Sequence, residues 1–181
     1  MNRKRVSKKY TEYEKKLIEY YWKCFISEFS KICIFFIIFM ILGLLPEYFV
    51  ALFTLITLRS NGGGLHFDHY ISCLAVSFTF LYGSIFLSKY VLPPQGIIYV
   101  SVLLCVLIGY HLVPITSSNR PPATSIQIQR SKRNTVIIIL LFFITMCTCP
   151  NISYIYICYW TVILHILQLI IAYLKEVKRN V

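Results

Sequence analysis

The sequence predicts an all-α, polytopic integral membrane bundle, and three features carry that prediction. Of its 181 residues, 57% are hydrophobic and only 14% are charged, whereas about a quarter of the residues in a typical soluble domain are charged. The mean hydropathy is +0.68. Prolines and glycines divide the chain into apolar runs, most of them long enough for a membrane helix. We expect a single membrane domain over residues 1–181, beginning with an N-terminal amphipathic helix that lies in the membrane interface.

The net charge of +11 is distributed in the way that membrane topology requires. Nine of the 18 basic residues precede Ile32, four lie between Arg120 and Arg133, and three follow Leu174. These groups flank apolar runs, which is the positive-inside pattern of membrane proteins. We therefore expect a multi-pass protein of the cell membrane with both termini in the cytoplasm, the lipid bilayer as its surroundings and no nucleic-acid partner.

Residues 1–31 form a basic amphipathic segment. Apolar and charged residues alternate with helical spacing from Tyr10 to Lys31, which predicts a helix in the interface. Residues 32–58 are apolar apart from Glu47, which follows Pro46. Because proline removes a backbone hydrogen bond and a carboxylate at mid-bilayer is costly, we expect a broken hairpin of two arms. The sequence leaves open whether these arms are two half-spans or parts of one span.

Prolines and polar stretches divide the rest of the chain in the same way. We expect a loop and helix start at 59–73, two spans within 67–113, a basic cytoplasmic loop at 115–134 and two spans within 135–174. Taking the spans in order, the Lys and Arg distribution brings residues 59–73 to the cytoplasmic side.

Residues 59–73 combine three consecutive glycines, Gly62 to Gly64, with two histidines, an aspartate and a cysteine. Three glycines would weaken a helix, so the backbone is expected to turn sharply or to approach another segment closely. A thiol beside an imidazole forms a cysteine nucleophile with its base, because only the thiolate attacks. Backbone N–H groups of the glycines could bind an oxyanion.

Spacing alone leaves the identity of the base open. His69 and Cys73 are four residues apart and would share a face of a continuous helix. If the helix begins near Phe67 or Asp68, His66 lies in the loop and can fold back over the first turns. Asp68 would then be a natural helix cap, and we also consider it as a group that orients an imidazole.

A metal site is the competing interpretation of these side chains, since His66, His69, Asp68 and Cys73 include possible zinc ligands. No second cluster of ligands accompanies them, because His111 and His165 are isolated in the sequence. We therefore expect no metal and no cofactor.

The order Arg59-x4-Gly64-x-His66-x6-Cys73 resembles the accessory gene regulator B (AgrB) family, the membrane peptidases of Gram-positive quorum sensing. A second stretch, Tyr110 to Pro114, also resembles the family, as do Arg120-Pro121 and the basic run Arg130 to Arg133. Length and hydropathy agree over essentially the whole chain. The family usually has Ala-Pro where this chain has Val113-Pro114, a departure that does not touch the catalytic pair.

The resemblance implies that Cys73 is the nucleophile and His66 its partner. Arg59 and Gly64 belong to the motif that carries the resemblance, and we expect them to support the pair. From the residues alone, we also consider Asp68 and His69 as supporting groups. It implies a cysteine endopeptidase that cleaves an AgrD-like precursor peptide through a Cys73 thioester. An internal Cys or Ser of the peptide then closes a thiolactone or lactone ring. Family members are thought to dimerise.

The family's precursors end in an acidic tail, and the basic loop is a candidate dock for it. The substrate-binding residues that we consider there are Arg120, Arg130, Lys132 and Arg133. The alternative function is a transporter or a non-enzymatic membrane partner of a signalling complex. Transporters usually carry polar residues along a pathway, and Glu47 is the main candidate within the predicted spans.

Overall fold

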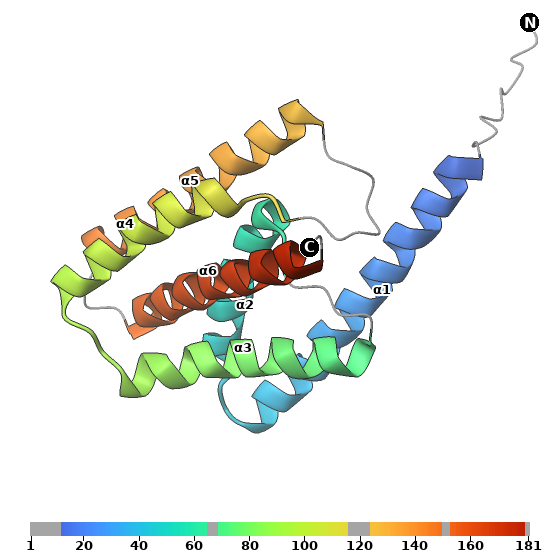
Figure 1. Ribbon diagram of the computed structural model, residues 1–181. Coiled ribbons are helices and arrows are strands. Elements are labelled where there is room, and N and C mark those ends of the chain that lie inside the picture. The colour runs from blue at the N-terminus through green and yellow to red at the C-terminus, as the bar shows by residue number, and fades with distance from the viewer. Residues whose placement is uncertain (1–11, 65–68, 116–123, 150–152, 180–181) are drawn as a thin grey trace, which may run out of the picture. The chain divides into compact units, whose positions relative to one another are not determined.

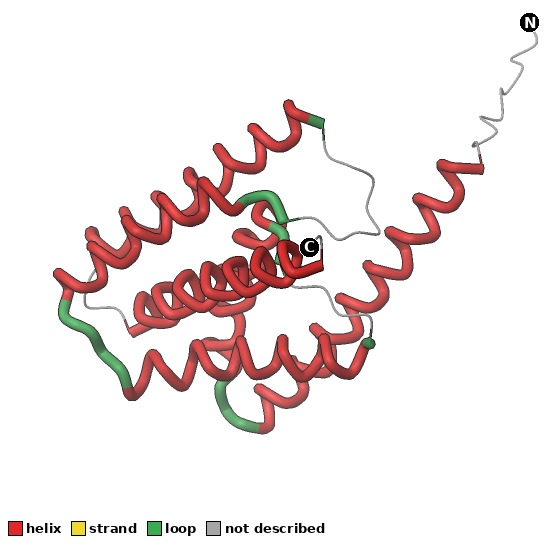
Figure 2. Tube along the Cα trace, in the orientation of Figure 1, coloured by secondary structure: helices red, strands yellow, loops and turns green. Residues whose placement is uncertain are grey.

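The computed structural model describes residues 12–64, 69–115, 124–149 and 153–179. Six α-helices account for nearly all of these residues, as the sequence predicts (Figures 1 and 2). In chain order they are α1 (Glu12–Ile41), α2 (Leu45–Gly62), α3 (Tyr70–Tyr90), α4 (Gln95–Leu112), α5 (Ser125–Thr148) and α6 (Ser153–Arg179). The chain forms two units, residues 1–38 and residues 39–181.

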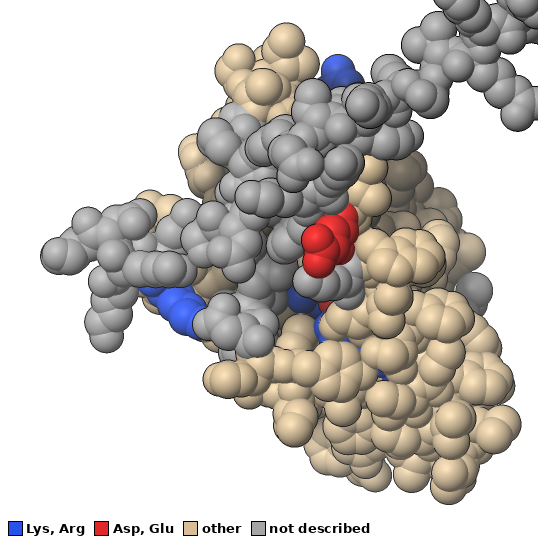
Figure 3. All heavy atoms as spheres, turned by 90° about the vertical axis from the view of Figure 1, so that its right-hand side faces the viewer, with Lys and Arg blue, Asp and Glu red and all other residues tan. Residues whose placement is uncertain are grey.

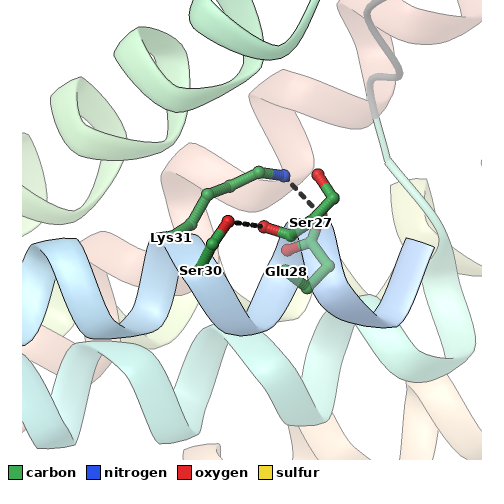
Figure 4. A network of polar contacts seen from close by, with 4 residues as sticks. All are labelled: Ser27, Glu28, Ser30 and Lys31. Atoms are coloured by element: carbon green, nitrogen blue, oxygen red, sulfur yellow. Dashed lines mark hydrogen bonds and ion pairs between the residues drawn. The ribbon is translucent and has the colours of Figure 1, made fainter. Parts of the chain in front are cut away.

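The first unit contains most of α1. The helix expected to end at Lys31 continues to Ile41, because neither proline nor glycine interrupts the chain between Glu12 and Ile41. Around residue 31, Lys31 Nζ lies 2.6 Å from Glu28 Oε1, and the Ser30 hydroxyl donates to the Ser27 carbonyl at 2.9 Å (Figure 4). Both pairs have the i,i+3 spacing of neighbours on a helix. The interfacial position of this segment stays a prediction.

Within residues 32–58 the helix is interrupted between Ile41 and Leu45, a few residues earlier than Pro46–Glu47. The chain turns at Gly43, whose φ is +67°, and the Leu44 N–H donates to the Phe39 carbonyl at 2.9 Å. Pro46 lies in the first turn of α2, where its missing N–H costs no helical hydrogen bond. Glycine therefore makes the turn, and proline begins the next helix.

In the second unit, α6 lies against α2, α3, α4 and α5 (Figure 1). Half of the apolar span of α6 is buried inside the protein, compared with 22% or less for each of the other spans. The buried cluster joins α2, α4, α5 and α6 through large apolar side chains, among them Leu58, Val102, Ile139 and Leu169. Helix α6 is thus the central helix of the second unit, and the other four helices of that unit pack against it.

Among the described residues, five helices are long and apolar enough to cross a membrane. Their spans are Cys24–Ile41, Tyr70–Tyr90, Gln95–Leu112, Ser125–Thr148 and Ser153–Lys175. Many large apolar side chains point outward, including Phe53, Ile71, Leu107 and Leu141. Uncharged residues cover most of the described surface on the face drawn in Figure 3. The protein is a multi-pass membrane protein, and lipid is the surrounding that such a surface requires.

The expected loop at 115–134 is helical in its second half. Helix α5 begins at Ser125 with a capping box: the Gln127 N–H donates to Thr124 Oγ1 at 3.4 Å, and the Thr124 N–H donates to Gln127 Oε1 at 3.0 Å. These two bonds satisfy N–H groups that a helix start otherwise leaves without a partner. The basic run Arg130 to Arg133 therefore lies on a helix and not in a loop.

Candidate active site

Arg59 lies in the last turn of α2, which extends beyond the predicted limit of Leu58 to Gly62. The helix ends because Gly63 adopts a φ of +78°, a conformation that favours glycine. The Gly63 N–H donates to the Arg59 carbonyl at 3.1 Å. This amide closes the helix end, so among the three glycine amides it is a poor choice for binding an oxyanion.

Each of the three glycines has a different close neighbour. A Cβ on Gly62 would lie 3.1 Å from His165 Nε2, and one on Gly64 would lie 3.1 Å from Arg59 Nε. A Cβ on Gly63 would collide with the carbonyl oxygen of Ile115. The backbone thus turns sharply at Gly63 and approaches other segments of the chain closely. We call residues 62–64 the glycine turn.

The glycine turn is held by segments that are distant in sequence. The Ile115 N–H donates to the Gly62 carbonyl at 3.2 Å, and Gly63 and Ile115 form a parallel β-bridge. Asn134 Nδ2 of α5 donates to Asn61 Oδ1 of α2 at 3.1 Å. The stretch ending at Pro114, whose peptide bond with Val113 is cis, therefore lies beside the stretch that contains Arg59 and Gly64.

Cys73 lies in the first turn of α3. The helix begins at Tyr70 with His69 as its N-cap, and the Cys73 N–H donates to the His69 carbonyl at 3.2 Å. The N-cap position is therefore occupied by His69, and Asp68, which we considered for it, lies outside the described residues. Cys73 is partly exposed, and the amino end of a helix favours a negatively charged group. This position suits a cysteine that acts as a thiolate.

Three predicted site residues, His66, Asp68 and Arg120, lie outside the described residues. The His66–Cys73 pair therefore stays a prediction, as do the supporting roles of Asp68 and His69. Within the described part of the chain, no three His, Cys, Asp or Glu side chains gather as metal ligands would.

The remaining predicted binding residues line one groove. Arg130, Lys132 and Arg133 of α5 border a hollow of about 720 Å³ together with Tyr110 of α4. Lys132 Nζ lies 5.3 Å from the centre of the Tyr110 ring, within the range of a cation–π contact. The other lining residues are Ile126, Gln129, Val136 and Ile137. No acidic residue is among them, so the groove offers positive charge beside an apolar wall.

His165 is a buried polar residue that the sequence did not single out. Its side chain on α6 is fully buried, and it is the neighbour of Gly62 described above. The sequence does not predict the contact between His165 and Gly62, because the two residues are about a hundred positions apart.

Glu47, the candidate for a transport pathway, lies in the first turn of α2. Its Oε1 is 3.7 Å from Lys89 Nζ, near the end of α3, and both side chains are partly exposed. This ion pair gives the Glu47 carboxylate a partner on α3.

The sequence matches the family description "AgrB: Accessory gene regulator B" over residues 2–170. Comparison with curated proteins finds no match, and neither does comparison with solved structures. The family match covers nearly the whole chain, including the glycine turn, the Cys73 helix and the basic groove. The chain therefore belongs to the AgrB family, and this membership implies the role of a membrane peptidase that processes an AgrD peptide.

Proposed function

We propose that this protein is a cysteine endopeptidase in which Cys73 forms a thioester with a precursor peptide. The observation that carries the proposal is the family match, which spans both Cys73 and the glycine turn. The position of Cys73 in the first turn of α3 supports it, because a helix amino end stabilises a thiolate.

In the first step, the Cys73 thiolate attacks the carbonyl carbon of the scissile peptide bond. The bond to nitrogen breaks, and the leaving amine takes a proton from the imidazolium of His66. In the second step, a thiol or hydroxyl of the bound peptide attacks the thioester carbonyl and gives its proton to His66. A thiolactone or lactone ring leaves, and Cys73 is released as the thiolate. Apolar surroundings would favour this ring closure over hydrolysis.

His66 is the proposed base because the family resemblance assigns it. His69 is the rival, since it caps the same helix one turn before Cys73. Replacing each histidine separately distinguishes the two, as described at the end of the Discussion.

We further propose that the basic groove binds the acidic tail of the precursor. Three cations and an aromatic ring line a hollow of about 720 Å³, and a cluster of this kind attracts an acidic peptide. Arg120 is proposed to add to it. Positive charge in this region also follows from membrane topology, so the proposal needs its own test.

We propose that the end of the bundle that carries the glycine turn faces the cytoplasm, together with both termini. The positive-inside distribution of Lys and Arg supports this orientation. A homodimer is likewise part of the proposal, on the family resemblance alone.

The direct test uses a candidate precursor encoded next to this protein, with an amphipathic start, a central Cys or Ser and an acidic end. Full-length protein in lipid vesicles is mixed with this peptide and analysed by mass spectrometry under denaturing conditions. We expect an adduct on Cys73 that hydroxylamine removes, as it removes thioesters. Cys73→Ala should abolish the adduct, whereas Cys147→Ala, which removes an exposed cysteine of α5, should preserve it. An adduct that survives Cys73→Ala would contradict the assigned nucleophile.

A further inference from the structure

His165 of α6 is a buried polar residue that lies against Gly62 of the glycine turn. Within the described part of the chain, four fully buried side-chain polar atoms have no hydrogen-bond partner: His165 Nδ1 and Nε2, Thr135 Oγ1 and Gln168 Oε1. Two of the four belong to one imidazole. Burying polar groups without partners is costly, so a role other than packing is expected of them.

His165 is placed against the turn by direct contact. Its Nε2 would be 3.1 Å from a Cβ on Gly62, and Leu169, one helical turn later, would be 3.8 Å from the same Cβ. Only a glycine lets the backbone of α2 come this close to α6 without displacing one of these side chains.

Arg59 connects this contact to the predicted site. Arg59 lies in the last turn of α2, which ends at Gly62. The Arg59 side chain also packs on Gly64, with Nε 3.1 Å from the position of an added Cβ. The imidazole therefore contacts the first glycine of the turn, and Arg59 contacts the last.

We propose that His165 is a positioning residue for the peptidase reaction: its imidazole fixes the place of Gly62 and, through the glycine turn and Arg59, the surroundings of Cys73. This inference rests on the proposed function. The imidazole is fully buried, so it acts through the turn and not on the substrate.

A purely structural role of His165 and a positioning role predict different stabilities and reactivities for variants at this position. A leucine at residue 165 would fill the site without burying two unpartnered nitrogens, so His165→Leu should not lower the melting temperature. It should nevertheless slow the reaction of Cys73. Glutamine keeps a polar nitrogen near the position of Nε2, whereas asparagine keeps one near Nδ1. Because Nε2 faces Gly62, His165→Gln should restore more reactivity than His165→Asn.

The experiment measures alkylation of Cys73 by iodoacetamide in full-length protein in vesicles, with the other six cysteines replaced. Relative to that parent, we expect His165→Leu to lower the rate about tenfold, the order of effect that a small displacement at a reacting group produces. Thr161→Val is the matched control, since Thr161 is buried on the same helix and its hydroxyl bonds the Ile157 carbonyl at 2.7 Å. This control should react like the parent.

A double-mutant cycle supplies the second arm. Gly62→Ala should slow alkylation in the parent, where the new methyl group meets the imidazole. The same change should have little further effect in the His165→Ala background, where the space is open. Equal effects of Gly62→Ala in both backgrounds would overturn the positioning role.

The outcomes separate the two proposals. If the parent reacts fast and His165→Leu reacts equally fast, the positioning role alone fails. It fails as well if His165→Leu is slow, melts at a lower temperature and is not rescued by glutamine. A parent thiol with ordinary reactivity would contradict the proposed function, and the positioning role with it.

Discussion

The two ends of helix α2 are built differently. At its start, Glu47 and Lys89 form a partly exposed ion pair beside a hollow of about 450 Å³ lined by Ser88, Ser153 and Tyr154. At its end, the glycine turn is held by a β-bridge, the Asn61–Asn134 hydrogen bond and a buried imidazole. The first arrangement joins two side chains, whereas the second fixes individual backbone atoms. We infer that the functional site lies at the C-terminal end of α2, beside the glycine turn.

The largest expected effect is on the glycine turn itself. Gly63→Ala forces a positive φ on a residue with a side chain and drives its Cβ into the Ile115 carbonyl. The strain should cost about 1–3 kcal/mol and abolish peptide processing. Gly96→Ala is the control, because no atom lies within 4 Å of an added Cβ there. Thermal unfolding in detergent and a processing assay measure both variants. If Gly63→Ala were as stable and as active as Gly96→Ala, the glycine turn would not be the more constrained end of α2.

Next in size is the groove. Replacing Arg130, Lys132 and Arg133 together by alanine should raise the KM for an acidic precursor about tenfold, a loss of ~1.4 kcal/mol. The effect should shrink as salt is added, because exposed charges are screened. Lys89→Ala, at the other end of the bundle, should leave KM unchanged. A triple variant with normal KM would show that these cations serve topology alone.

A smaller effect is expected at the contact between α2 and α5. Asn134→Ala removes the hydrogen bond to Asn61 Oδ1, which should cost about 1 kcal/mol of stability. We expect a lower melting temperature and a partial loss of processing. A variant with unchanged stability and activity would mean that the bond does not hold the turn.

The smallest effect is predicted for the start of α2. Glu47→Gln breaks an ion pair of partly exposed groups, which is worth no more than about 1 kcal/mol. Processing should be unaffected in a vesicle assay. A large loss of activity would restore Glu47 as a functional residue and remove the contrast between the two ends.

The sequence predicted the features that depend on local chemistry. The helices follow from apolar runs between prolines and glycines, and the need for glycine at residue 63 follows from its conformational freedom. The start of α5 can also be predicted, since Thr124 and Gln127 have the spacing of a capping box. The polar composition of the surrounding residues favours a loop instead. The continuation of α1 past Lys31 differs from the prediction, because a change from charged to apolar composition does not by itself end a helix.

Contacts between distant segments could not be predicted in the same way. Nothing in the sequence pairs Gly63 with Ile115 or places His165 against Gly62, because both depend on how the helices pack. A single histidine in an apolar run has the same local pattern whether it lies under a turn or beside lipid. The partner of Cys73 stays a prediction that rests on the family resemblance.

The central claim is that Cys73 is an activated nucleophile, and the most direct measurement is its alkylation rate as a function of pH in membranes. The other six cysteines are replaced, and the curve is repeated with His66→Ala and with His69→Ala. An unperturbed thiol titrates near ~8.5. We expect Cys73 to react well below that pH, and only His66→Ala to abolish the shift. A thiol with ordinary reactivity in all three proteins, unchanged when a candidate precursor is present, would contradict the claim.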